Sequence, residues 1–524
     1  MRNRNPRTQQ KSARPNSRFS EQFPGARDPQ KSQPGSRRVY VPRKGTKSGP
    51  QGHLHNPRGP RDVPEIEQGV EKFSIIIRNV AQEMNLRDKL DPEPAPLAPL
   101  DYTAELELKN AAIRKFWELH NLPDKPSRVI ASPLPRHYRS TSKRRLIRKG
   151  KHWEWDFFLE RLGGGKAKEG PGILEPVTHE AVYKQALEKL NEDPYRNLAD
   201  SLNFLIVRGA PELMVIFNVF RLNAEVVRKT RMLAEHLAHR EGSGVVAAHI
   251  FFDASRSEYY LEAQVSPGPF RIKKLFGPEF LPIGIEAWRY YLHPTGFFQV
   301  NTSILPRLMD EVKIALKTSK QDRFLDLYCG CGLFTFPVAK DCREAHGVEA
   351  SPMACDAARQ SASFLRSPNT RFVSGRIEAR KLSKLLPLPD GTPEVLLLDP
   401  PRQGTSPGLI PALAERKPRR IAYLFCEMDT IPGEIGKWRK QGYMVAKVVP
   451  FDMFPGTNNL EVLVLLLPDK YGLLNRKPPS KPVSGNAPED AGKPVSQAKA
   501  AAPKPWMQPK SGMHGKRSRK APRR

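Results

Sequence analysis

The middle of the chain contains the stretch Arg323-Phe324-Leu325-Asp326-Leu327-Tyr328-Cys329-Gly330-Cys331-Gly332-Leu333-Phe334-Thr335. Its apolar run, residues 324–327, predicts a buried strand. Gly330-x-Gly332 predicts a tight turn, and we expect a helix to start around Ala339. A strand, a glycine turn and a helix in this order are typical of the first half of a nucleotide-binding βαβ unit, in which glycines let the backbone approach a ligand closely.

A second predicted strand ends in Gly347-Val348-Glu349. An acidic residue about 20 positions after such a turn commonly accepts hydrogen bonds from a ribose. Gly-x-Gly alone is weak evidence, so two ordinary turns of an α/β domain remain an alternative at this point.

The charge is concentrated at the two ends of the chain. The 524 residues carry a net charge of +31; residues 1–63 hold 15 Lys/Arg against three acids, and residues 471–524 hold 13 against two. Both ends are rich in Pro, Gly, Ser and Gln, which predicts disorder. Basic arms of this kind attract phosphates and favour an RNA or DNA partner. A solubility tail or an acidic protein partner is the alternative.

The cysteines and the hydropathy pattern bear on the compartment. The five cysteines all lie between Cys329 and Cys426, and we expect free thiols in a reducing, cytoplasmic setting. No run approaches the length of a membrane span, and no apolar signal core follows the basic N-terminus. Cys329 and Cys331 are interpreted as small turn residues, so no metal site is predicted there.

The region before residue 300 predicts a mixed α+β arrangement without a catalytic signature. Residues 90–100 resemble a Pro-rich linker, and residues 105–119 predict an amphipathic helix. Strands are expected at 203–208, 212–220 and 244–252, with a helix at 224–239. We interpret this region as a domain that holds the substrate.

A basic segment lies inside this region, at residues 136–151. It interleaves cations with Tyr138 and is followed by Trp153 and Trp155. That composition suits nucleic acid, because charges meet phosphates and rings stack on bases. A solvated run of charge beside a β-element is the alternative.

From residue 320 to 468 the pattern becomes βαβα, which predicts an open parallel sheet. Further strands are expected to end at Asp399 and Cys426, and a closing pair is expected at 444–449 and 460–467. Ligands of such sheets bind at the carboxyl ends of the strands, so Asp326, Glu349, Asp399 and Cys426 should share one edge. The closing pair favours a class I methyltransferase sheet over a dehydrogenase sheet.

Three residues in this sheet are candidates for chemistry. Cys426 at the end of a strand is well placed as a nucleophile, although a buried structural cysteine fits the spacing equally well. Asp399 precedes two prolines, whose rigid, extended backbone could aim the carboxylate at a ligand. Glu461 opens an apolar strand, an unusual place for a carboxylate unless it is used, and a surface acid that caps the strand is the alternative.

Together these motifs resemble one family, the RNA uracil-C5 methyltransferases that act on tRNA and ribosomal RNA. The resemblance is strong over about 290–468 and weak before it. The motifs that carry it occur in this order: Phe297-Phe298-Gln299-Val300-Asn301, Leu325-Asp326-Leu327-Tyr328-Cys329-Gly330, Gly347-Val348-Glu349, Asp399-Pro400-Pro401-Arg402-x-Gly404, Cys426, and Phe454-Pro455-x-Thr457-x-x-x-Glu461. The chain departs from the family pattern at Glu427 and Met428, which follow the cysteine, at Asn459, and at Arg376.

The resemblance implies S-adenosylmethionine as the methyl donor. It matches Gln299, Tyr328, Glu349 and Asp399 to positions that contact this cofactor, Cys426 to the nucleophile and Glu461 to the base. The implied product is 5-methyluridine in tRNA or rRNA. No cysteine precedes Cys329, so no iron–sulfur cluster of the kind that some members carry is expected.

Two other functions remain open. Another nucleic-acid methyltransferase, acting on cytosine C5 or on an exocyclic amine, would use the same cofactor. A non-catalytic RNA-binding protein on a degenerate methyltransferase scaffold would use neither Cys426 nor Glu461.

The expected organisation is a class I, Rossmann-like methyltransferase fold with an α+β central domain and disordered basic termini. Its parts are an N-terminal arm (1–63), a central RNA-binding or substrate-binding region (64–300), a methyltransferase domain (301–468) and a C-terminal tail (469–524). RNA is the expected partner, and neither a membrane nor a metal is expected.

Overall fold

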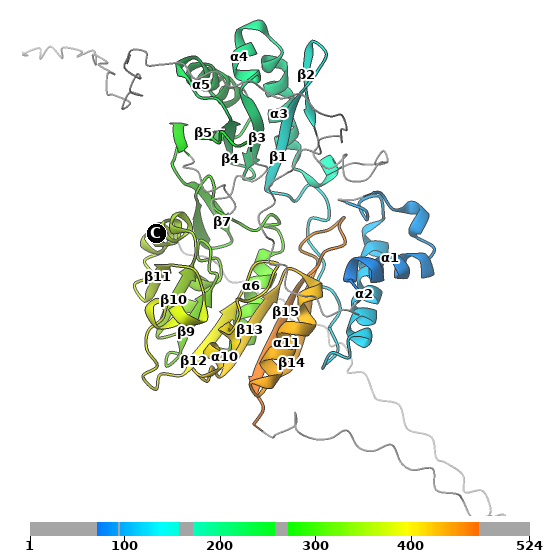
Figure 1. The fold of residues 1–524 in the computed structure, drawn as a ribbon, viewed down its shortest axis with the longest axis vertical. Helices are drawn as coiled ribbons and strands as arrows, with labels where there is room; N and C mark the ends of the chain where they lie inside the picture. Colours follow the sequence, from blue (N-terminus) through cyan, green and yellow to red (C-terminus); the bar gives the residue numbers. More distant parts are fainter. Residues whose placement is uncertain (1–70, 93–94, 157–170, 241, 257–270, 471–524) are drawn as a thin grey trace, which may run out of the picture. The chain divides into compact units, whose positions relative to one another are not determined.

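A seven-stranded sheet forms the centre of the C-terminal half of the molecule (Figure 1). The computed structural model describes residues 71–92, 95–156, 171–240, 242–256 and 271–470, all within one structural unit. The strand order is β11-β10-β9-β12-β13-β15-β14. The strand bounds are β9 Arg323–Leu327, β10 Glu344–Glu349, β11 Thr370–Ser374, β12 Glu394–Leu398, β13 Arg420–Phe425, β14 Tyr443–Phe451 and β15 Glu461–Pro468.

The sheet combines a parallel part with an antiparallel end. Strands β9 to β13 pair in parallel, and β15 is antiparallel to both β13 and β14. The predicted parallel sheet and closing pair are therefore confirmed, whereas β11 was not predicted. Its sequence, Thr-Arg-Phe-Val-Ser, is short and half polar, and so gives a weak strand pattern.

Helices cover both faces of this sheet. On one face α6 (Leu305–Leu316), α7 (Thr335–Ala339) and α8 (Pro352–Phe364) share a buried cluster with Phe324, Leu397 and Leu424. On the other face the helices pack with Leu325, Leu398 and Tyr423. These helices are α1 Phe73–Glu83, α2 Tyr102–Leu119, α9 Leu382–Leu385, α10 Leu409–Ala414 and α11 Ile431–Lys440.

The helix after the glycine turn starts earlier than the sequence predicted. We expected it to begin around Ala339, but α7 begins at Thr335 and ends at Ala339. The hydroxyl of Thr335 donates a 2.5 Å hydrogen bond to Asp326 Oδ2 at the end of β9. This contact brings the start of the helix directly behind the turn.

The N-terminal part of the described chain packs against the seven-stranded sheet. The predicted helix at 105–119 is confirmed as α2, which starts at Tyr102 because Asp101 Oδ1 caps it by accepting from Thr103 N at 2.9 Å. The described residues of the expected linker at 90–100 are instead mostly buried, and Leu97 is fully buried. Its prolines gave the appearance of a linker, but its apolar residues fill the space beside α2.

The central region forms a second sheet of six strands, in the order β2-β1-β3-β4-β5-β6. The predicted strands and helix at 203–252 are confirmed as β3, β4, α5 and β5. The bounds are β1 Thr141–Lys149, β2 His152–Asp156, β3 Leu202–Arg208, β4 Leu213–Val219, β5 Val245–Phe252, β6 Arg271–Phe276, α3 Val177–Leu190, α4 Arg196–Ala199 and α5 Ala224–Ala238. A separate hairpin of β7 (Leu281–Ile285) and β8 (Trp288–Leu292) leads toward α6.

The basic segment at 136–151 is only partly available to a nucleic acid. Arg144 is 2% exposed, pairs with Glu175 at 2.7 Å and lies over the ring of Tyr183. Arg136 pairs with Glu105 at 3.0 Å and donates to the carbonyls of Ala98 and Leu100. The prediction of a phosphate-binding run was thus wrong for these two arginines. Strand alternation turns Arg144 inward, and the guanidinium of Arg136 is already bound to Glu105 and to backbone carbonyls.

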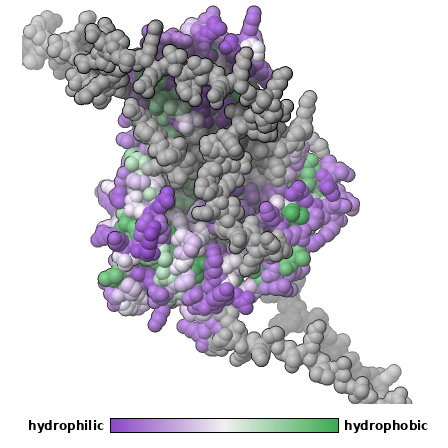
Figure 2. Space-filling model, viewed as in Figure 1, coloured by the Kyte–Doolittle hydropathy of each residue, from purple (hydrophilic) through white to green (hydrophobic). Residues whose placement is uncertain are grey.

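The described surface is mostly polar on the face that Figure 2 shows. Hydrophobic residues form small, separate patches there. Among the described residues no helix is both long and apolar enough to cross a membrane, and no group of three His, Cys, Asp or Glu side chains could hold a metal ion. The predicted basic arms lie outside the described residues, except for Asp469 and Lys470.

Candidate active site

The residues predicted at strand ends meet at one edge of the seven-stranded sheet. Tyr328 follows β9, Glu349 ends β10, Asp399 follows β12 and Cys426 follows β13. These four strands are parallel neighbours, so their carboxyl ends lie at the same edge. Strand β15 runs in the opposite direction, which brings its first residue, Glu461, to that edge as well.

Cys426 and Glu461 lie side by side across two strands. The last residue of β13, Phe425, pairs with Val462 of β15. Cys426 follows Phe425 and Glu461 precedes Val462, and the Glu461 carboxyl is close enough to raise the pKa of the Cys426 thiol. Residues opposite each other in antiparallel strands project to the same face, with Cβ atoms about 4.5–5.5 Å apart. The thiol and the carboxyl therefore face the same space.

Strand alternation also puts Asp326 and Asp399 on that face. Leu397 and Leu424 pack in the cluster that contains α6, as does Leu463. Asp399, Cys426 and Glu461 are each two residues from one of these three, and side chains two apart on a strand project to one side. Asp326 stands in the same relation to Phe324.

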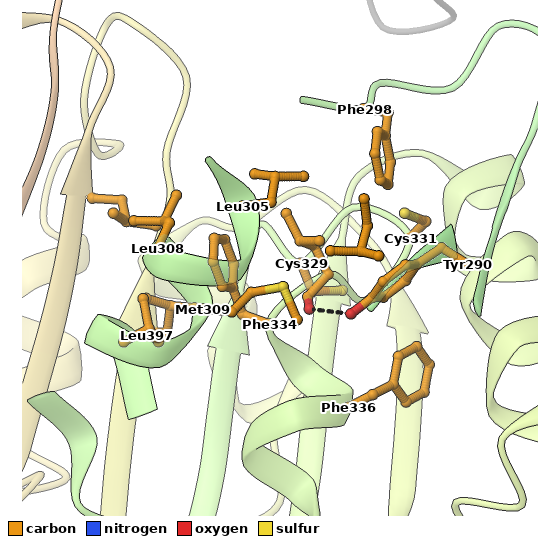
Figure 3. Close-up of a cluster of buried hydrophobic side chains, with 14 of the residues drawn as sticks. Tyr290, Phe298, Leu305, Leu308, Met309, Cys329, Cys331, Phe334, Phe336 and Leu397 are labelled. Atoms are coloured by element: carbon orange, nitrogen blue, oxygen red, sulfur yellow. Dashed lines mark hydrogen bonds between the residues drawn. The ribbon is translucent and has the colours of Figure 1, made fainter. Parts of the chain in front are cut away.

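The glycine turn packs against a cluster of buried hydrophobic side chains (Figure 3). Tyr290 from β8 donates a 2.8 Å hydrogen bond to the carbonyl of Leu333, and Cys329 and Cys331 point into the surrounding cluster. Burial raises the pKa of Cys331 to about 12, so this thiol stays protonated at neutral pH. Within the turn, Gly330 has φ +54°, and a Cβ added there would meet no atom within 4 Å.

Glu349 is fixed at the side of this turn. Its Oε2 accepts from Gly330 N at 3.1 Å, and its Oε1 accepts from Ser351 N at 2.9 Å. Each carboxylate oxygen retains lone pairs for another donor. Gln299 is 8% exposed and lies in the segment between β8 and α6; two residues later, Asn301 donates to the carbonyl of Met453 at 3.2 Å. This contact ties the Gln299 segment to the loop that precedes Glu461.

The carboxyl of Glu461 is buried without a hydrogen bond. The residue is 1% exposed, and neither oxygen has a hydrogen-bond partner among the described residues. Burial, together with the nearby Asp399, raises its pKa well above the usual value, and the guanidinium of Arg402 opposes the shift. Burial and the carboxyls of Glu461 and Asp399 likewise raise the pKa of the Cys426 thiol. The Cys426 thiol is therefore protonated in the free protein at neutral pH, and the shift of the Glu461 pKa favours the neutral carboxyl.

Two further carboxyls, those of Asp399 and Asp326, also have raised pKa values, so that a bound cation would be favourable at this site. Burial and the neighbouring Asp326 and Glu349 raise the pKa of Asp399 to about 7. Burial and Glu349 raise the pKa of Asp326 to about 7, against the hydrogen bond from Thr335. Oδ1 of Asp326 lacks a hydrogen-bond partner among the described residues. A cationic ligand would favour the ionised form of all these groups.

The loop after Asp399 is anchored by a carboxylate that the sequence did not single out. Glu434 of α11 is 3% exposed, and its Oε2 accepts from Thr405 Oγ1 at 2.6 Å and from Tyr423 OH at 2.5 Å. These bonds hold the end of the Pro400–Thr405 segment against β13. A charged residue on the apolar face of a short helix was the available signal.

Comparison with known proteins assigns the family. Residues 270–469 match the model of the tRNA (uracil-5-)-methyltransferase family. An uncharacterized RNA methyltransferase of Clostridium acetobutylicum is 33% identical over 379 residues, which cover 71% of this chain and 80% of that protein. A second one, from Gloeobacter violaceus, is 30% identical over 384 residues and is covered to 79%. The chain belongs to the tRNA (uracil-5-)-methyltransferase family.

A solved structure confirms the class I methyltransferase fold of this RNA methyltransferase. The tRNA (uracil-54, C5)-methyltransferase of Pyrococcus abyssi, in complex with S-adenosyl-L-homocysteine, superimposes with a TM-score of 0.53 at 21% identity. The match covers 72% of this chain and 86% of that chain.

The methyltransferase uses S-adenosylmethionine as its cofactor, as its family does. The residues at the sheet edge fit this group on their own chemistry. A sulfonium is a cation, and Asp399 and the unpartnered Oδ1 of Asp326 lie where positive charge is favoured. The free lone pairs of Glu349 suit the hydroxyls of a ribose, and the open side of Gly330 gives access to the turn.

Proposed function

We propose that this protein methylates C5 of a uridine in RNA, either tRNA or rRNA, through a covalent adduct between Cys426 and C6 of the base. The observation that carries the proposal is that Cys426 and Glu461 directly adjoin the paired residues Phe425 and Val462, with the Glu461 carboxyl close enough to raise the pKa of the thiol. A nucleophile next to a buried, unpartnered carboxyl is the arrangement that this reaction needs.

The proposed roles follow from the chemistry of uracil. Its C5 is a poor nucleophile, and attack of the Cys426 thiolate on C6 forms an S–C6 bond while the C5=C6 π electrons move to C5 and O4. S-adenosylmethionine supplies the methyl group, which C5 takes as the bond from sulfur to methyl breaks. Glu461 then removes the C5 proton, the C5=C6 bond re-forms, and the bond to Cys426 breaks with its electron pair on sulfur. The target base must leave its stack to reach these groups.

The raised pKa values of Cys426 and Glu461 suggest a role for the positive charge of the cofactor. Cys426 and Glu461 must both lose a proton before they can act, yet burial and nearby carboxyls raise the pKa of each. A cation held by Asp399, Glu349, Tyr328 and Gln299 lowers the pKa of neighbouring acids. Arg402 acts in the same direction on both residues. Binding of the methyl donor thus prepares the nucleophile and the base.

RNA that contains 5-fluorouridine tests the proposal directly. Fluorine at C5 cannot be removed as a proton can, so the reaction should stop at the adduct. We expect a protein–RNA band that survives denaturation, that requires S-adenosylmethionine for its methylated form, and that disappears in Cys426→Ala. Glu461→Gln should still form the adduct but should fail to release product from ordinary uridine RNA.

Cys342→Ala is the matched control for the trap. Cys342 is buried near the amino end of β10, away from the edge that carries Cys426, so this variant should retain the band. A wild-type protein that binds RNA without forming a band would overturn the proposal. Methyl transfer from labelled cofactor in that case would indicate an amine methyltransferase, and its absence would indicate a non-catalytic RNA-binding protein.

A further inference from the structure

The loop between β14 and β15 leads directly into Glu461, and contacts from outside the hairpin hold it. Its consecutive carbonyls each accept a hydrogen bond from a distant part of the chain. Met453 O accepts from Asn301, Phe454 O from Lys109 at 3.4 Å, Pro455 O from Tyr138 OH at 3.0 Å and Gly456 O from Leu97 N at 2.9 Å.

A buried charge network from α2 anchors the start of this loop. Lys109 Nζ lies 2.8 Å from Glu105 Oε1 and 2.7 Å from Asp452 Oδ1, and all three side chains are 0% exposed. Glu105 Oε1 also accepts from Gly456 N at 2.6 Å, and its Oε2 pairs with Arg136. Two cations and two carboxylates therefore balance each other within the network.

Lys109 remains charged in this setting. Burial alone would lower its pKa, but the facing carboxylates of Asp452 and Glu105 raise the pKa above the usual value. A fully buried ion pair contributes little net stability, because desolvation offsets the attraction. An apolar side chain would serve packing equally well, whereas the ammonium fixes the position of Asp452 and of the Phe454 carbonyl.

The geometry of Glu461 needs such an external support. Its carboxyl has no hydrogen-bond partner among the described residues that could orient it. Its backbone is paired with Phe451, the residue before Asp452. The loop that Lys109 contacts, residues 452–460, therefore connects the two paired residues Phe451 and Glu461 directly.

We propose that Lys109 is a positioning residue that, through Asp452 and the loop at 452–460, fixes the proposed base Glu461 for removal of the C5 proton. This inference rests on the proposed function, since it concerns one step of that reaction. It assigns α2, outside the part of the chain that the family model matches, a role in the last chemical step.

The test separates proton removal from adduct formation. The double variant Lys109→Met with Asp452→Asn keeps the network neutral, because Glu105 and Arg136 still balance each other. With RNA labelled with tritium at uridine C5, we expect adduct formation within about threefold of wild type and tritium release slowed by about 10- to 100-fold. The adduct with ordinary uridine RNA should then accumulate, as it should in Glu461→Gln.

Lys115→Met is the control on the same helix, since Lys115 is 37% exposed and pairs with Glu83 on the surface. It should match wild type in both rates. A parallel fall of both rates in the double variant would mean a general structural role, and unchanged tritium release would mean no role; either result overturns the inference. Absence of tritium release from wild type would instead overturn the proposed function and this inference with it.

Discussion

At the scale of single residues, burial and mutual repulsion raise the pKa values of the acids at the site, and a bound cation would lower them again. Asp399 is the residue for which this is most accessible to measurement, because burial and the neighbouring Asp326 and Glu349 raise its pKa to about 7. At pH 7 it is therefore about half protonated in the free protein. As pH rises through 7 the carboxylate forms, and its attraction for a sulfonium grows.

We therefore expect S-adenosylmethionine binding to release protons near pH 7 and to tighten as pH rises from 6 to 8. Titration calorimetry in two buffers of different ionisation enthalpy measures the number released. S-adenosylhomocysteine is the matched ligand, because its sulfur is uncharged, and it should release fewer protons. Equal release by both ligands would contradict the role of the charge, and Asp399→Asn should reduce the release.

At the scale of secondary structure, the residues at the strand ends could be predicted from sequence, whereas the buried polar contacts that hold the surrounding segments could not. The apolar runs of β9, β12 and β13 end at polar or reactive residues, so Asp399 and Cys426 could be assigned to one edge from sequence alone. Strand β1 escaped prediction because its inward positions include Ser142 and Arg144, whose partners His179 and Glu175 lie more than 30 residues away. Lys109 was hidden for the same reason, since its partner Asp452 is 343 residues distant.

The bonds from Glu434 give a prediction at this scale. Glu434→Gln removes the charge to which Thr405 and Tyr423 donate, and charge-assisted bonds are the stronger kind. We expect a loss of about 1–3 kcal/mol in the free energy of unfolding, together with weaker cofactor binding, because the loop after Asp399 loses its anchor on α11. Urea denaturation and calorimetry measure the two effects. Glu415→Gln, at an exposed position after α10, should change neither.

At the scale of the whole molecule, the charge distribution separates attraction to RNA from the chemistry. Residues 1–63 and 471–524 carry net charges of +12 and +11 out of +31, whereas the proposed catalytic residues all lie in the described part of the chain. Arg136 and Arg144 are occupied by carboxylates, which leaves fewer free cations on the central domain than its sequence indicates. The terminal arms should therefore supply much of the sequence-independent affinity.

Removal of both arms should weaken RNA binding and reduce its dependence on salt, while methyl transfer at saturating RNA stays unchanged. Each phosphate that the arms no longer neutralise should lower the slope of log Kd against log salt concentration by about 0.7–0.9. Binding measured from low to moderate salt checks this. A chain with the order of residues 471–524 scrambled should behave as the full chain if charge alone is responsible, and one with their Lys and Arg replaced by Gln should behave as a chain without this tail. Equal slopes for the full and truncated chains would place the RNA-binding surface on the folded domains instead.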